Sequence, residues 1–143
     1  MRKTLMLAVL LALALTGCHR NVKTTQKEPQ QTVAVETFDS PEALFSAIEE
    51  AVFAKQDTQK SIALVDQLLA DYPDFDKNPV ALFMLASFVY DEQLHDLDKA
   101  RETYQQIVDD YPDSPFANDA AISITQLGMT PDELVRMFEA NQE

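Results

Sequence analysis

The chain has 143 residues, of which 24 are acidic and 11 are basic, so its formal net charge is −13 at pH 7. Such an excess of carboxylates repels phosphate groups, which argues against nucleic acid, lipopolysaccharide and anionic lipid headgroups as ligands. A basic segment of another protein is a better electrostatic match. The alternative explanation of the acidic excess is that it only keeps the domain soluble. The chain has one cysteine, so it forms no internal disulfide and its fold depends on packing.

The N-terminus has the pattern of an export signal. Arg2 and Lys3 provide a basic start, residues 5–15 are all apolar, and the sequence LTGC at 15–18 ends this run with small residues. The apolar run is too short to cross a bilayer, which takes about 20 residues. We therefore predict that residues 1–17 are a signal peptide that is removed.

The sequence LTGC resembles the lipobox of bacterial lipoproteins. This resemblance implies cleavage before Cys18 and attachment of fatty acyl chains such as palmitate to that cysteine. Several acyl chains anchor a protein durably, whereas a single chain holds it reversibly. His19 rather than aspartate follows the cysteine. In enteric bacteria this implies a location in the outer membrane, facing the periplasm.

Residues 18–37 are rich in Gln, Thr and Lys, and they contain little apolar material apart from Val33-Ala34-Val35. A segment of this composition cannot bury enough surface to fold by itself. We predict a flexible tether with an average reach of about 25 Å, and a short strand at 33–35 is the alternative. Removal of residues 1–17 leaves 9 basic against 24 acidic side chains, a formal charge of −15.

From residue 38 onward, apolar residues recur at the three- and four-residue spacing of amphipathic helices. This spacing predicts six helices: from Ser40-Pro41 to Lys55, from Thr58 to before Pro73, Pro79 to Leu94, Leu97 to Asp110, Phe116 to Leu127, and from Pro131 through Phe138. The third is apolar nearly all round, so it should be central. Expected N-terminal caps are Ser40, Asp98, either Asp113 or Ser114, and a capping box from Thr130 to Glu133.

The tetrapeptide DYPD occurs at 71–74 and again at 110–113, which is 39 positions later. Each copy lies where a proline ends one helix before the next helix begins. Helix pairs repeated at such a period are typical of a helical repeat array.

The second of these pairs resembles the tetratricopeptide family. Ala100, Tyr104 and Pro112 have the spacing of the family's second helix and terminal proline. The family's first-helix spacing is reproduced with aliphatic substitutions at Leu82, Leu85, Ala86 and Val89. The resemblance implies an all-α domain over residues 38–143, built as a short superhelix of about three stacked antiparallel helix pairs.

The same resemblance implies a groove that binds a partner, because in the tetratricopeptide family the first helix of each pair lines such a groove. Carried over to this chain, the groove positions are Phe45, Glu49, Val52, Phe83, Ser87, Tyr90 and Asp91. Exposed aromatic side chains beside carboxylates suit a basic or amphipathic segment. Core packing is the alternative role of Phe83 and Tyr90. The segment YPDSPFA at 111–117 also looks like the outer-membrane protein assembly lipoprotein family.

The sequence predicts no enzyme, no cofactor and no metal site. Asp74, Asp76 and Asn78 have the spacing of the first ligands of a calcium loop, but Pro79 occupies the position of the required glycine. His95 is expected to be a solvated surface residue. If Cys18 carries lipid, the mature chain has no thiol nucleophile, and its single glycine excludes glycine-rich phosphate loops. A small envelope hydrolase that uses a carboxylate pair is the last alternative.

These features together predict a membrane-anchored periplasmic lipoprotein. Its repeat domain is expected to act as a protein interaction scaffold in a complex that assembles or maintains the cell envelope. The alternative from another class is a structural spacer that self-associates into a homo-oligomer.

Overall fold

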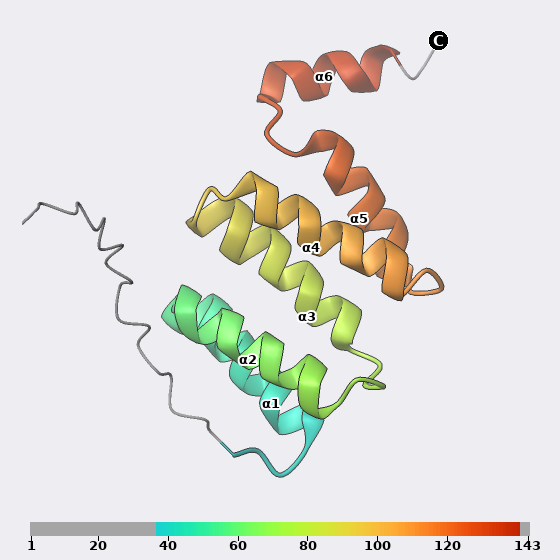
Figure 1. Ribbon diagram of the computed structural model, residues 1–143. Coiled ribbons are helices and arrows are strands. Elements are labelled where there is room, and N and C mark those ends of the chain that lie inside the picture. The colour runs from blue at the N-terminus through green and yellow to red at the C-terminus, as the bar shows by residue number, and fades with distance from the viewer. Residues whose placement is uncertain (1–36, 141–143) are drawn as a thin grey trace, which may run out of the picture. The chain divides into compact units, whose positions relative to one another are not determined.

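The computed structural model describes residues 37–140, which belong to one compact unit. These residues form helices and no strand (Figure 1). In chain order the elements are α1 (Pro41–Glu49), η1 (Glu50–Lys55), α2 (Thr58–Asp71), α3 (Asn78–Met84), η2 (Leu85–Gln93), α4 (Leu97–Asp110), α5 (Pro115–Gln126) and α6 (Pro131–Ala140). None of these helices has the length and apolar content needed to cross a bilayer.

Several predictions for the N-terminal segment lie outside the described residues. They are the signal peptide at 1–17, the lipid attachment at Cys18, and the tether with its alternative strand at 33–35.

Side-chain caps fix where the helices begin. Ser40 Oγ accepts a hydrogen bond from the Ala43 backbone N–H at 3.2 Å, and Ser114 caps α5 in a similar way. These two predicted caps are confirmed. The predicted cap at Asp98 is wrong, because the side chain of Asp96 accepts from the Lys99 N–H at 3.1 Å and Asp98 lies in the first turn of α4.

The capping box before α6 is also confirmed. The Thr130 backbone N–H donates to Glu133 Oε2 at 2.8 Å, and the Glu133 N–H donates back to Thr130 Oγ1 at 3.4 Å. The Thr130 backbone N–H and the Thr130 hydroxyl both donate to the Glu133 carboxylate, and they lower its pKa because they stabilise the charged form.

The 39-residue repeat seen in the sequence is a repeat of local structure. Tyr72 and Tyr111 end α2 and α4 with nearly the same backbone angles. Each tyrosine carbonyl then accepts from a backbone N–H three residues later, from Phe75 at 3.1 Å and from Ser114 at 2.9 Å. The two DYPD copies therefore form the same turn.

The first helix of each of the first two pairs widens toward its C-terminal end, which the sequence did not predict. α1 continues as η1 and α3 continues as η2, and both η segments are π-helical, with more residues per turn than an α-helix. A residue with positive φ follows each of them: Gln56 directly after η1 at 51°, and His95 two residues after the end of η2 at 53°. The predicted single α-helix from Pro79 to Leu94 is thus an α-helix only as far as Met84.

The hydrophobic core lies between the first two helix pairs and α5. Its fully buried members include Leu44, Ile48, Val65, Leu68, Leu82, Val89 and Ile107. The segment formed by α3 and η2 contacts α2, α4, α5 and η1, and Figure 1 shows it in the middle of the stack. The prediction that the third helix is central is confirmed.

The predicted all-α, tetratricopeptide-like fold is confirmed, with a difference in its last pair. α5 packs against α4 and α3, and it buries Ala117 and Ala120. α6 makes only sparse contact with the other helices and has no buried residue. The third pair therefore closes the core with α5 alone.

Asn78 provides a test of the first turn. Its side chain is fully buried, and its Nδ2 donates to the carbonyls of Tyr72 at 2.8 Å and Pro73 at 2.9 Å. Asn78→Ala leaves both carbonyls without this donor, so we expect the free energy of unfolding to fall by about 1–3 kcal/mol. Urea denaturation of the full chain measures it. Asn118→Ala, at an exposed position of α5, is the control, and equal midpoints for the two variants would contradict the assignment.

Candidate partner-binding surface

The structure places three of the seven predicted groove residues in the core. Phe45 is 6% exposed, Val52 is 1% exposed and Tyr90 is 8% exposed. The Phe45 ring packs edge-on against Phe75, with 6.2 Å between ring centroids. These three side chains fill the space between helices, so they offer little surface to a partner.

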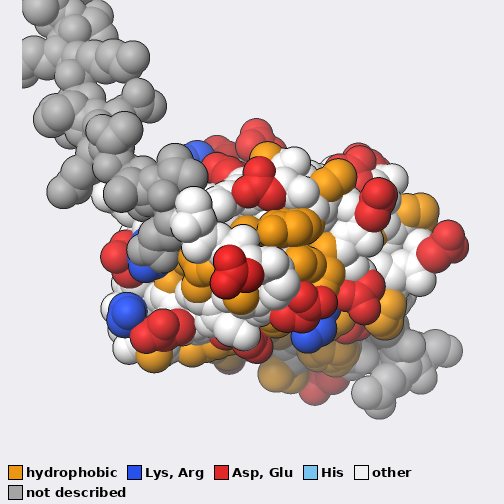
Figure 2. Space-filling model, turned by 90° about the horizontal axis from the view of Figure 1, so that it is seen from below, with side chains coloured by type: hydrophobic (Ala, Val, Ile, Leu, Met, Phe, Trp, Pro, Cys, Tyr) orange, Lys and Arg blue, Asp and Glu red, His pale blue; other side chains and the backbone are white. Residues whose placement is uncertain are grey.

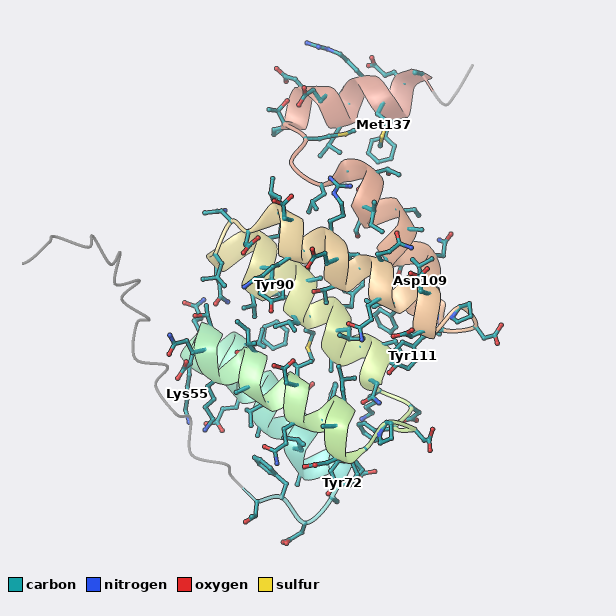
Figure 3. The ribbon with its side chains drawn as sticks, viewed as in Figure 1. Lys55, Tyr72, Tyr90, Asp109, Tyr111 and Met137 are labelled. Carbon is teal, nitrogen blue, oxygen red and sulfur yellow. The ribbon has the colours of Figure 1, made fainter. Side chains whose placement is uncertain are left out.

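The wide turn of η2 explains where Tyr90 lies. In an α-helix, Phe83 and Tyr90 share a face because seven residues make about two turns. The additional residue per turn in η2 carries Tyr90 off that face. Its ring lies 5.5 Å from Lys99 Nζ, and Figure 3 shows it on the side of η2 toward α2. Burial raises the pKa of Tyr90, as do the carboxylates of Asp66, Asp96 and Glu102.

Phe83, Ser87 and Asp91, which are four residues apart along α3 and η2, are half-buried. The Phe83 ring packs against Tyr104 with 5.3 Å between centroids and against Phe116 with 5.5 Å. Burial raises the pKa of Tyr104, the hydroxyls of Ser123 and Ser87 lower it, and the charge of Asp91 raises it. This row therefore faces α4 and α5.

A partly exposed aromatic pair, which the sequence reasoning missed, lies on η1 and η2. Phe53 is 50% exposed, and its ring meets that of Phe88 edge-on with 4.9 Å between centroids. Glu49, a predicted groove residue, is exposed one turn before Phe53. The signal in the sequence was that Phe53 is a large apolar residue off the buried stripe of the first helix. We call Glu49, Phe53 and Phe88 the aromatic surface.

A cleft of about 510 Å³ lies at the C-terminal end of the predicted row. Asp91 is the predicted groove residue that lines it, and exposed His95 lies beside it. Its apolar walls are Leu97, Leu127, Met129 and Leu134. The cleft therefore has one carboxylate and one imidazole beside apolar walls.

A second cleft, of about 420 Å³, separates the two DYPD turns. Its lining includes four carboxylates among prolines: Asp74, Asp76, Asp110 and Asp113. Between residues 37 and 140, no three His, Cys, Asp or Glu side chains gather closely enough to hold a metal ion. Asn78, which had a calcium-like spacing in the sequence, is turned into the protein to bind two backbone carbonyls.

Acidic side chains outnumber basic ones on the polar surface of the described residues. Figure 2 shows apolar side chains gathered on one face with Asp and Glu side chains around them and few Lys or Arg. Carboxylates that border an apolar patch favour ligands with both apolar and basic groups.

The helix pairs, the DYPD turns and the acidic, partly apolar surface define a tetratricopeptide-like repeat protein. Residues 39–134 match the family YfiO, described as outer membrane lipoprotein. The match covers most of the chain, so this protein belongs to that family. It is a lipid-anchored protein of the outer membrane that faces the periplasm. Searches of curated proteins and of solved structures gave no significant match.

Tyr90 and Phe53 are expected to respond differently to truncation. Tyr90→Ala removes a buried ring, so we expect the free energy of unfolding to fall by about 3–5 kcal/mol. Phe53→Ala removes a half-exposed ring and should cost about 1 kcal/mol. Chemical denaturation of both variants measures this difference. A Tyr90→Ala variant as stable as the wild type would contradict the core position of Tyr90.

Proposed function

We propose that this lipoprotein holds another envelope protein on its repeat domain, as a scaffold in a complex that assembles or maintains the cell envelope. The observation that carries the proposal is the aromatic surface, where Phe53 is half exposed although a neighbouring phenylalanine packs against it. Aromatic side chains with free area are enriched at the centres of protein interfaces. The half-buried row of Phe83, Ser87 and Asp91 faces α4 and α5 instead, so it is not part of this contact region.

The carboxylates around the aromatic surface indicate what kind of partner it would bind. Glu49 lies within one turn of Phe53, and Glu92 is exposed one turn after Phe88. Apolar rings between carboxylates fit a segment that carries both apolar and basic side chains. The role needs binding alone, so we propose that the protein is not an enzyme and uses no cofactor.

The N-terminal segment completes the proposal. Residues 1–17 direct export and are removed, Cys18 carries the acyl chains, and residues 18–37 tether the domain of residues 38–143 to the membrane. Membership of an outer membrane lipoprotein family supports this division. So does the LTGC sequence, which contains the only cysteine.

The lipid anchor is tested by Cys18→Ala in the full-length gene. Without the thiol no acyl chain can be attached, so we expect the protein to leave the membrane fraction. Fractionation of cells followed by mass spectrometry of the N-terminal peptide measures both location and modification. Retention of Cys18→Ala in the outer membrane would show that another segment anchors the chain.

The aromatic surface is tested by photo-crosslinking in cells, with a photoreactive phenylalanine in place of Phe53 in the full chain. We expect an adduct with another envelope protein, because a half-exposed ring in an interface is fully covered on binding. The control is the same probe at Glu102, an exposed position of α4. Mass spectrometry identifies the adduct. Adducts between two copies of this chain would favour the self-associating spacer, and no adduct at Phe53 would overturn the surface assignment.

A further inference from the structure

The exposed apolar side chains are concentrated at one end of the described chain. Of the seven large hydrophobic residues exposed between 37 and 140, only Phe53 lies on the aromatic surface. The other six lie in the turn after η2, at the start of α4, on or just after α5, and on α6: Leu94, Leu97, Ile122, Met129, Val135 and Phe138. We call these six the terminal face. An apolar concentration of this kind marks an interaction site in a soluble domain.

α6 is the main part of the terminal face that lacks a partner. Leu134, Val135, Met137 and Phe138 form one apolar stripe at the three- and four-residue spacing of a helix. Val135 is 55% exposed and Phe138 is 53% exposed, and no residue of α6 is buried. Met137 lies on the side of α6 toward α5 in Figure 3. The stripe is thus only partly covered by the chain itself.

The stripe continues into the cleft of about 510 Å³ described above. Leu134 of α6 and Met129 before it line that cleft together with Leu97. Gly128 makes the close approach there, because it has φ +79° and a Cβ at this position would lie 3.0 Å from Leu97 Cδ1. Backbone conformation and packing therefore hold the start of α6 beside the cleft.

The charges around the terminal face decide what can cover it. α6 carries Asp132, Glu133 and Glu139 against one basic residue, Arg136, and Asp91 lies in the cleft. A second copy would bring the same carboxylates against this face, in a chain of net charge −13. Like charges disfavour that pairing, whereas a segment with Lys or Arg beside its apolar side chains is attracted.

We infer that the terminal face is a second docking surface, separate from the aromatic surface, for an amphipathic helix of another protein that carries basic residues along the borders of its apolar stripe. The apolar stripe of that helix would pack between α6 and the cleft at Leu97 and Met129. Its basic side chains would meet Asp91 and the carboxylates of α6. Recognition of a helix in an apolar groove uses this division of apolar and charged contacts.

The probes are two synthetic amphipathic helices of about 14 residues, or four turns. They share one leucine stripe, and its borders carry lysine in one peptide and glutamate in the other. The full-length lipoprotein is placed in phosphatidylcholine nanodiscs, with empty nanodiscs as the blank. Fluorescence anisotropy should show binding of the lysine peptide, weakened by salt, and no binding of the glutamate peptide. Equal binding of both peptides, or of neither, would overturn the inference.

Matched variants locate the bound peptide. Phe138→Glu should weaken binding of the lysine peptide by about tenfold or more, with an unchanged melting temperature because the ring is exposed. Phe53→Glu is the control, since the same residue type is 50% exposed on the aromatic surface. A loss with Phe53→Glu alone would place the peptide on the aromatic surface, which overturns this inference and leaves the proposed function intact.

Sedimentation of the lipid-free full chain carrying Cys18→Ala tests whether a second copy of this chain covers the terminal face instead. We expect the mass of one chain. A dimer that Phe138→Glu dissociates would show that a second copy covers the terminal face, and it would overturn the assignment to a basic helix.

Discussion

Burial of the segment formed by α3 and η2 is the constraint on which the rest of the structure depends. This segment is apolar nearly all round, so it is stable only when helices cover it on several sides. η1 and α2 cover one side, and α4 and α5 cover the other. Fully burying one large aliphatic side chain contributes about 1.5–3 kcal/mol, and Leu82 and Val89 are among the buried ones on this segment. The order of the stack follows from this need for cover.

The wide turns are the second feature that shapes the surface. In the first two pairs, the first helix ends in a π-helical segment, and a residue with positive φ, Gln56 or His95, lies in the turn that follows. Neither of these residues is glycine. Such a conformation costs free energy, so the surrounding structure must hold it in place. An aspartate follows each of these residues and caps the next helix. This combination of a π-helical segment, a residue with positive φ and an aspartate cap occurs twice. It affects which side chains of the two helices face the core.

The surface that results has two separate apolar areas, for each of which we propose a partner. The aromatic surface lies on η1 and η2, within the first two helix pairs, and the terminal face lies at the pair that the core does not complete. Both are apolar with carboxylates around them. A protein anchored in the outer membrane that carries two such surfaces is suited to holding basic segments of two partners, or of one long partner, in the periplasm. Its acidity also keeps these apolar areas soluble until they are covered.

The sequence alone determined the helices, their order and the repeat. These features depend on signals that act over a few residues, so they can be recognised without the fold. The signals are the proline within each DYPD turn, the serine caps and the helical spacing of apolar residues. The sequence also contained LTGC, which resembles a lipobox, and the acidic excess, which favours a partner with basic residues. The tertiary structure decided which side chains are free. Tyr90 enters the core because the wide turn of η2 changes the number of residues per turn. Phe53 lies off the apolar stripe by helical spacing already, and the structure shows that its ring stays half exposed. The uncovered stripe of α6 was likewise decided by packing, since an amphipathic spacing shows that a helix has an apolar side but not whether another helix covers it.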